Sequence, residues 1–133
     1  MFSYLRRAQY HETDQMGVIH HANYVKWMEE ARIAFLDSVG ISYRGMEEAG
    51  IVSPVVSISV DYKQSVYFDD EIAVYVRTEK YNGIRLRVRY EFRRAADDTL
   101  CAEASSEHCF LKNGRLVSLK KEMPEVDAAL VAV

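Results

Sequence analysis

The chain has 133 residues, 49% of them hydrophobic and 28% charged, so we expect residues 1–133 to form one globular domain around one core. This composition excludes disordered and fibrous chains, and a net charge of −3 gives no basic surface for nucleic acid. No apolar run approaches a membrane span and residues 1–10 lack the apolar core of a signal peptide, so we expect a cytoplasmic protein without integral membrane association.

The first predicted elements are a short strand over residues 3–10 and the only long helix, over residues 23–39. Apolar residues recur in the second range at helical spacing, at Tyr24, Trp27, Met28, Ala31, Phe35 and Val39. Gly40 follows as a stop signal. Because Trp27 and Met28 lie on this apolar stripe, we expect both in the core and not in an acyl pocket.

After the helix the hydrophobic period changes to two. From residue 51 onward this alternation predicts a half-buried strand whose apolar face consists of Val56, Ile58, Val60 and Tyr62. Residues 71–81 and 84–93 flank Asn82-Gly83, which predicts a hairpin with a two-residue type I′ turn. In its second strand one face is apolar and the other charged, and the apolar face is Ile84, Leu86, Val88, Tyr90 and Phe92.

The last third of the chain continues the antiparallel pattern. Residues 99–112 predict a strand that turns at Asn113-Gly114 and returns over residues 115–119, and Pro124 suits the first turn of a short terminal helix. Together the elements predict an α+β domain in which a sheet covers one helix. Such a sheet has exposed edges, which favours pairing between chains.

The two cysteines, Cys101 and Cys109, stand eight positions apart in one predicted strand. An extended chain would separate them by ~26 Å, which is too far for a disulfide. We expect two reduced thiols. The sequence contains no CxxC motif and no Cys/His cluster, so we expect no metal site.

The stretch between the first strand and the helix, residues 10–24, concentrates titratable side chains, including three of the four histidines. Gly17 lets the chain turn or approach a ligand closely. A helix that begins near residues 21–23 presents unpaired N–H groups at its positive end. Asp14 as nucleophile or general base, a histidine as orienting group and these N–H groups as donors to an oxyanion would supply what acyl transfer needs.

The same residues also have structural interpretations, which spacing alone leaves open. Asn23 is a common helix-capping residue, and a loop aspartate such as Asp14 often binds neighbouring backbone amides. His20 and His21 are adjacent, so we do not expect both to project into one site. We expect the two remaining polar residues of this stretch to face solvent, namely His11 and Glu12.

Three motifs follow one another here: T-D-x-x-G-V from Thr13, H-x-N-Y from His21 and E-x-A-R from Glu29. In this order and spacing they resemble the signature of the 4-hydroxybenzoyl-CoA thioesterase-like hotdog proteins, and the predicted strand order suits that family from end to end. The resemblance implies a hotdog fold, in which an antiparallel sheet of about five or six strands wraps around one long helix. It also implies hydrolysis of an acyl-CoA thioester to free acid and CoA.

The resemblance also carries roles to individual residues. It implies that Asp14 is the catalytic carboxylate, as nucleophile or general base, and that Tyr10 and His21 belong to the active site, which favours His21 over His20. Backbone N–H groups around His21 and Ala22 would polarise the thioester carbonyl. The residues expected to bind substrate at the helix start are Gly17, Ala22, Asn23 and Tyr24.

For assembly, the resemblance implies a homodimer or homotetramer with acyl-CoA bound between subunits. CoA is part of the substrate, and no cofactor is expected. Basic residues near the hairpins could contact CoA phosphates, although a charged strand face is more often solvated or paired across the sheet, for instance with Glu103 and Glu107. These basic residues are Lys80, Arg85, Arg87 and Arg89.

Two other functions fit a domain of this kind. Hotdog hydratases and dehydratases also use a carboxylate and a histidine, but their histidine lies in a proline- and glycine-rich loop. The prolines of this chain, Pro54 and Pro124, are not beside a histidine. A non-catalytic module that binds acyl thioesters is the other alternative, and the joint presence of Tyr10, Asp14 and His21 argues against it.

Overall fold

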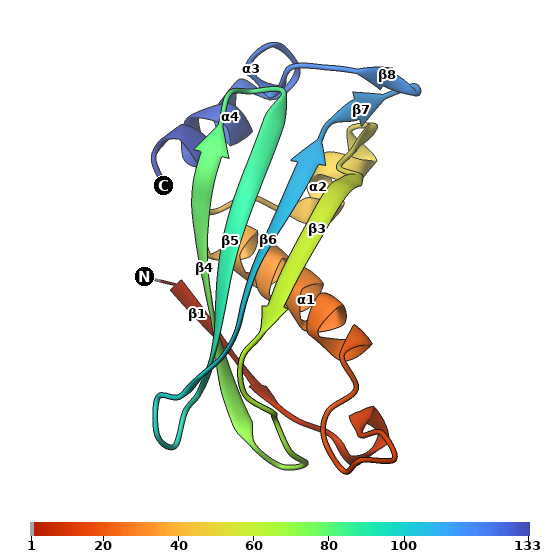
Figure 1. The fold of residues 1–133 in the computed structure, drawn as a ribbon. Helices are drawn as coiled ribbons and strands as arrows, with labels where there is room; N and C mark the ends of the chain where they lie inside the picture. Colours follow the sequence, from red (N-terminus) through yellow and green to blue (C-terminus); the bar gives the residue numbers. More distant parts are fainter. Residues whose placement is uncertain (1) are drawn as a thin grey trace.

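The computed structural model describes residues 2–133, and an antiparallel sheet against the long helix α1 dominates it (Figure 1). The element order confirms the predicted α+β architecture. The bounds are β1 Phe2–Arg7, the 3-10 helix η1 Tyr10–Glu12, α1 Ala22–Ser38, α2 Tyr43–Glu48, β2 Ile51–Val52, β3 Val55–Tyr62, β4 Glu71–Tyr81, β5 Arg85–Arg94, β6 Leu100–Cys109, β7 Leu111–Lys112, β8 Arg115–Leu116, α3 Leu119–Glu122 and α4 Pro124–Val131.

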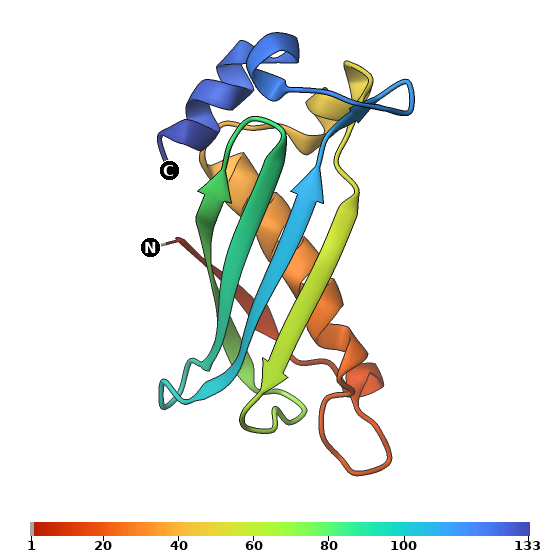
Figure 2. The ribbon, with the colours of Figure 1, turned by 45° about the horizontal axis from the view of Figure 1, so that its top comes forward.

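The main sheet has five strands in the order β1-β4-β5-β6-β3, and all neighbouring strands are antiparallel. β2, β7 and β8 form a separate three-stranded sheet. This order leaves β1 and β3 as the edges of the main sheet. Figure 2 shows α1 behind the sheet, with α3 and α4 at the end opposite the loop that precedes α1. That loop and the β4–β5 hairpin therefore lie at opposite ends of the molecule.

Helix α1 packs its apolar stripe against the sheet, as its spacing predicts. Trp27 is 0% exposed and Met28 is 1% exposed, which confirms both as core residues. They belong to one cluster with the inward residues of β5, which are Leu86, Val88, Tyr90 and Phe92. The helix ends at Ser38, just before Gly40, whose φ of +84° lies in the left-handed region that favours glycine.

The prediction of a half-buried strand over β3 is wrong for the single chain. Most of its apolar face stays open, with Val56 48%, Ile58 40% and Tyr62 48% exposed, whereas Val60 is partly buried against the core. The reason is position, because β3 is the outermost strand and pairs only with β6. The alternation correctly marks a strand with one apolar face, but within residues 2–133 that face is covered only in part, at Val60 and at the ring of Tyr62.

The β4–β5 hairpin forms as predicted, but its turn lies one residue later. The backbone N–H of Asn82 donates to the carbonyl of Arg85 at 3.2 Å, so the two turn residues are Gly83 and Ile84. Only Gly83 has a positive φ, of +90°, whereas a type I′ turn needs two such residues. The side chain of Asn82 explains the shift, because its Oδ1 accepts from the N–H groups of Ile84 and Arg85 at 3.0 and 2.8 Å.

The second hairpin has the predicted two-residue turn, with φ of +52° at Asn113 and +75° at Gly114. The strand predicted over residues 99–112 is divided into β6 and β7, which belong to different sheets. Helix α4 begins at Pro124, as predicted. Cys101 and Cys109 are both free, which confirms the expected thiols.

The sequence reasoning missed the short helix α2, which follows α1 closely. Its N-cap is Ser42, whose Oγ accepts from the backbone N–H of Gly45 at 2.9 Å. None of the helices found between residues 2 and 133 is both long and apolar enough to cross a membrane.

Candidate active site

The loop that carries Asp14 folds back on itself in a tight turn. The Asp14 carbonyl accepts from the N–H of Gly17 at 3.0 Å, and the Asp14 N–H donates to the carbonyl of Val18 at 2.9 Å. Gly17 has a φ of +82°, which explains the glycine at this position. The carboxylate Oδ1 of Asp14 also accepts from the N–H of Met16 at 2.8 Å. The Asp14 carboxylate therefore binds a neighbouring backbone amide, as loop aspartates often do, through Oδ1 alone. Its second oxygen, Oδ2, has no partner within the described chain.

Helix α1 starts directly after this loop, with His21 at the N-cap position, and the His21 side chain makes no capping hydrogen bond. The N–H of Ala22 donates to Nδ1 of His20 at 3.2 Å, and the N–H of Asn23 donates to the His20 carbonyl at 3.0 Å. Along residues 20–24, only the N–H of His21 has no acceptor within the described part of the chain. A free donor at a helix N-terminus suits a developing negative charge.

Asp14 and His21 line one cavity of about 270 Å³ at this helix end, together with Tyr24. Residues 62–65, at the end of β3 and just beyond it, form the facing wall. Of the residues predicted for the site, the structure brings these three together. The remaining predicted site residues do not line the cavity, and they are Tyr10, Gly17, Ala22 and Asn23.

Two of those residues have other surroundings. Tyr10 is 76% exposed and its ring packs edge-on against Phe68 with centroids 5.5 Å apart. Asn23 is buried and does not cap the helix. Its Nδ2 instead donates to the carbonyl of Glu12 at 2.9 Å and to that of His20 at 3.3 Å.

Tyr62 belongs to the cavity, and the sequence reasoning did not assign it there. Its hydroxyl donates to the carbonyl of His21 at 3.0 Å, and its ring lies edge-on to Tyr24 with centroids 4.9 Å apart. Burial raises the pKa of both tyrosines, so both hydroxyls stay protonated at neutral pH. No local signal could reveal Tyr62, because it meets His21 across 41 positions of sequence.

The prediction for Glu12 is wrong. It was expected to face solvent, but its exposure is 3%. A carboxylate is rarely buried without partners, and Glu12 has several, among them Arg6 and the indole of Trp27. His11 is exposed, as predicted.

Comparison with known proteins identifies the family. The model of the thioesterase-like superfamily matches residues 8–130. The chain belongs to the thioesterase-like superfamily. It is 33% identical to the DHNA-CoA thioesterase of Staphylococcus aureus, covering 98% of this chain and 88% of that one with a TM-score of 0.94.

Other relatives of this thioesterase agree over nearly the whole length. A protein of Aquifex aeolicus, provisionally named an esterase, is 36% identical over 94% of this chain and 96% of its own. The acyl-CoA thioesterase YbgC of Haemophilus influenzae is 25% identical over 92% and 90%. The fold is thus the hotdog fold, as the three motifs implied, and the protein is a thioester hydrolase.

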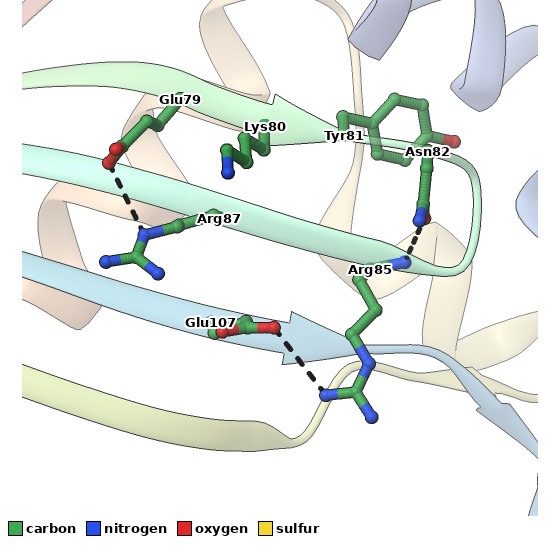
Figure 3. Close-up of a pocket in the computed structure, with 7 residues that line it drawn as sticks. All are labelled: Glu79, Lys80, Tyr81, Asn82, Arg85, Arg87 and Glu107. Atoms are coloured by element: carbon green, nitrogen blue, oxygen red, sulfur yellow. Dashed lines mark hydrogen bonds and ion pairs between the residues drawn. The ribbon is translucent and has the colours of Figure 1, made fainter.

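The thioesterase has a larger hollow of about 790 Å³ beside the β4–β5 hairpin (Figure 3). Its basic side chains are largely paired with carboxylates, Arg87 with Glu79 at 3.5 Å and Arg85 with Glu107 at 3.7 Å. This matches the expectation that a charged strand face is paired across the sheet. The hollow beside this hairpin lies at the opposite end of the molecule from the loop that precedes α1, so the smaller cavity is the candidate active site.

Proposed function

We propose that the protein hydrolyses acyl-CoA thioesters to a free acid and CoA, with Asp14 as the catalytic carboxylate. The observation that carries this proposal is one cavity lined by Asp14 and by His21, at a helix N-terminus where the His21 N–H is free. A thioester carbonyl that accepts from this N–H becomes more electrophilic, and the oxyanion of the tetrahedral intermediate is stabilised there.

Two routes fit this arrangement. As nucleophile, the Asp14 carboxylate attacks the carbonyl carbon, the CoA thiolate leaves, and water hydrolyses the resulting anhydride. As general base, Asp14 removes a proton from a water molecule that attacks the same carbon directly. In both routes the products are a carboxylic acid and CoA. His21 orients the substrate or the water, and Tyr24 and Tyr62 enclose the cavity. No cofactor takes part in either route.

We further propose a homodimer, or a tetramer built from dimers, in the cytoplasm. The support is β3, an edge strand with free backbone groups and a largely exposed apolar face. Pairing of β3 with its copy in a second chain would satisfy these backbone groups and bring side chains of the second chain beside this face. Tyr62 lies at the end of β3 and also lines the cavity, so the partner subunit would lie close to the active site.

The test is a continuous assay of thiol release over a panel of short, long and aromatic acyl-CoAs. The panel includes 1,4-dihydroxy-2-naphthoyl-CoA, the substrate named for several relatives, among them one from Prochlorococcus marinus. We expect turnover of at least one member, unaffected by a metal chelator. No release from any member by folded, oligomeric protein would refute the proposal, and tight CoA binding without hydrolysis would identify a binding module.

A further inference from the structure

A buried carboxylate lies two residues before Asp14. Glu12 is the only acidic residue of the described chain that is buried, with 3% exposure. Its carboxylate accepts four hydrogen bonds. Oε1 accepts from the backbone N–H of Gln9 at 2.8 Å and from Nη1 of Arg6 at 3.2 Å. Oε2 accepts from Nη2 of Arg6 and from Nε1 of Trp27, both at 2.9 Å.

The backbone of Glu12 binds the other end of the catalytic loop. Its carbonyl accepts from the N–H of His20 at 2.8 Å and from Nδ2 of the buried Asn23 at 2.9 Å. One residue thus joins β1, η1, the end of the loop and the start of α1. Between these two anchored points the chain makes the turn that carries Asp14.

We call Glu12 with its partners Arg6, Trp27 and Asn23 the clamp. Within it, Arg6 is held in place by contacts of its own. Its Nε donates to Oε1 of Glu30 at 3.0 Å, an oxygen that also accepts from the hydroxyl of Tyr4 at 3.0 Å. The guanidinium lies over the ring of Trp27, 5.5 Å from its centroid. Because the planar guanidinium of Arg6 is held by Glu30 and by the Trp27 ring, it presents its two Nη donors to the Glu12 carboxylate in one orientation.

We propose that Glu12 is a positioning residue, which through Arg6, Trp27 and Asn23 sets where the Asp14 carboxylate lies relative to the free N–H of His21. This inference rests on the proposed function of Asp14. The Glu12 carboxylate does not line the cavity and has all of its acceptor sites directed at protein donors, so it acts through its neighbours.

The test uses Glu12→Gln, which keeps the size of the side chain and removes its charge. A displacement of about 1 Å at a reacting group costs on the order of 10²-fold in rate. We therefore expect kcat to fall by about 10- to 100-fold with a much smaller change in KM. Glu91→Gln is the matched control, because it removes an Arg-bound carboxylate on the outer face of the sheet, where Glu91 accepts from Arg93 at 2.9 Å. The control should keep its kcat.

A double variant separates positioning from simple loss of stability. If Glu12 acts through Asp14, then adding Glu12→Gln to Asp14→Asn lowers kcat no further. An equal, additive loss in both backgrounds, or a single variant with kcat within about twofold of the parent, would overturn the inference. If Glu12→Gln does not fold, Arg6→Lys provides the same test, since lysine keeps the charge and loses the fork.

A readout independent of activity keeps this inference separate from the proposed function. We expect Glu12→Gln to shift the amide resonances of Asp14, Met16 and Ala22, and Glu91→Gln to leave them unchanged. Unshifted resonances would overturn the clamp even in an active enzyme. Full activity of Asp14→Asn alone would overturn the proposed role of Asp14 while leaving a clamp that the shifts still report.

Discussion

The side chain of Asp14 has both a proposed chemical role and a structural contact with the backbone, and two substitutions separate them. Asparagine keeps an Oδ1 that can accept from the N–H of Met16, whereas alanine cannot. We expect Asp14→Asn to lower kcat on the order of 10²-fold or more without loss of stability. Asp14→Ala should show the same loss of kcat and, in urea unfolding, a further loss of about 0.5–1.5 kcal/mol. Near-normal turnover of Asp14→Asn would make Asp14 a structural residue.

For His21, the main chain matters more than the imidazole. The N–H assigned to the oxyanion and the carbonyl bound by Tyr62 both belong to the backbone, so they survive His21→Ala. We expect a smaller fall in kcat than for Asp14→Asn, measured at saturating substrate. A larger fall would make His21 the principal acid or base and reverse the two roles.

His108 is a buried histidine far along β6 from the active-site cavity. It is 0% exposed, and its Nε2 is 2.7 Å from Oγ of Ser106, which in turn lies 2.7 Å from the hydroxyl of Tyr90. Burial, with a smaller effect of the charge on Arg32, lowers the pKa of His108 to about 3. The folded protein therefore holds this imidazole neutral throughout the physiological range.

The sign of its effect on stability follows from the pKa. Above about pH 6.5 His108 is neutral in both states. As the pH falls from there towards 3, the unfolded chain binds a proton that the folded chain does not, so the folded state loses up to about 1.4 kcal/mol per pH unit. We expect His108→Gln to flatten the fall of unfolding free energy with acid, measured by urea titration at several pH values. The exposed His11→Gln serves as control, and an unchanged slope in His108→Gln would contradict this account.

Among the elements, α1 shows why one motif position is small. Ala31, within the E-x-A-R motif, is 0% exposed on the side of α1 that faces the core. Interiors are close-packed, so a larger side chain must displace its neighbours. We expect Ala31→Leu to destabilise the protein by about 1–3 kcal/mol in urea unfolding. Ala34→Leu adds the same volume at a partly exposed position of the same helix, and its stability should change much less.

At this scale the sequence predicts what depends on local chemistry. The helix and both hairpins were predictable because apolar spacing and Asn-Gly pairs act within a few residues. The burial of Glu12 was not, because it depends on Arg6 and Trp27 meeting in space. The same holds for Tyr62, which reaches the catalytic loop only after the sheet has formed. The motif predicted that Asp14 and His21 belong to one site, but it did not predict residues 62–65, which form the facing wall of the cavity.

For the whole molecule, the open edge of β3 makes an oligomer the expected state. A charge placed on its apolar face should oppose pairing, so we expect Ile58→Lys to lower the mass measured by light scattering from a dimer or tetramer towards a monomer, with loss of activity. Leu5→Lys changes a residue that is 59% exposed on the opposite edge strand, β1, and should remain at least dimeric. A fully active monomer would refute a site that depends on two chains.

Trp27 is the single tryptophan of the chain, and its surroundings give it a spectroscopic use. The indole is completely buried, donates to a carboxylate and lies beneath a guanidinium, so its excited state experiences two fixed charges of opposite sign. Its emission comes from one environment only. Movement of the catalytic loop away from α1 would change that local field before the core opens. The unlabelled protein therefore contains its own optical probe of loop position, suited to stopped-flow measurements with substrate.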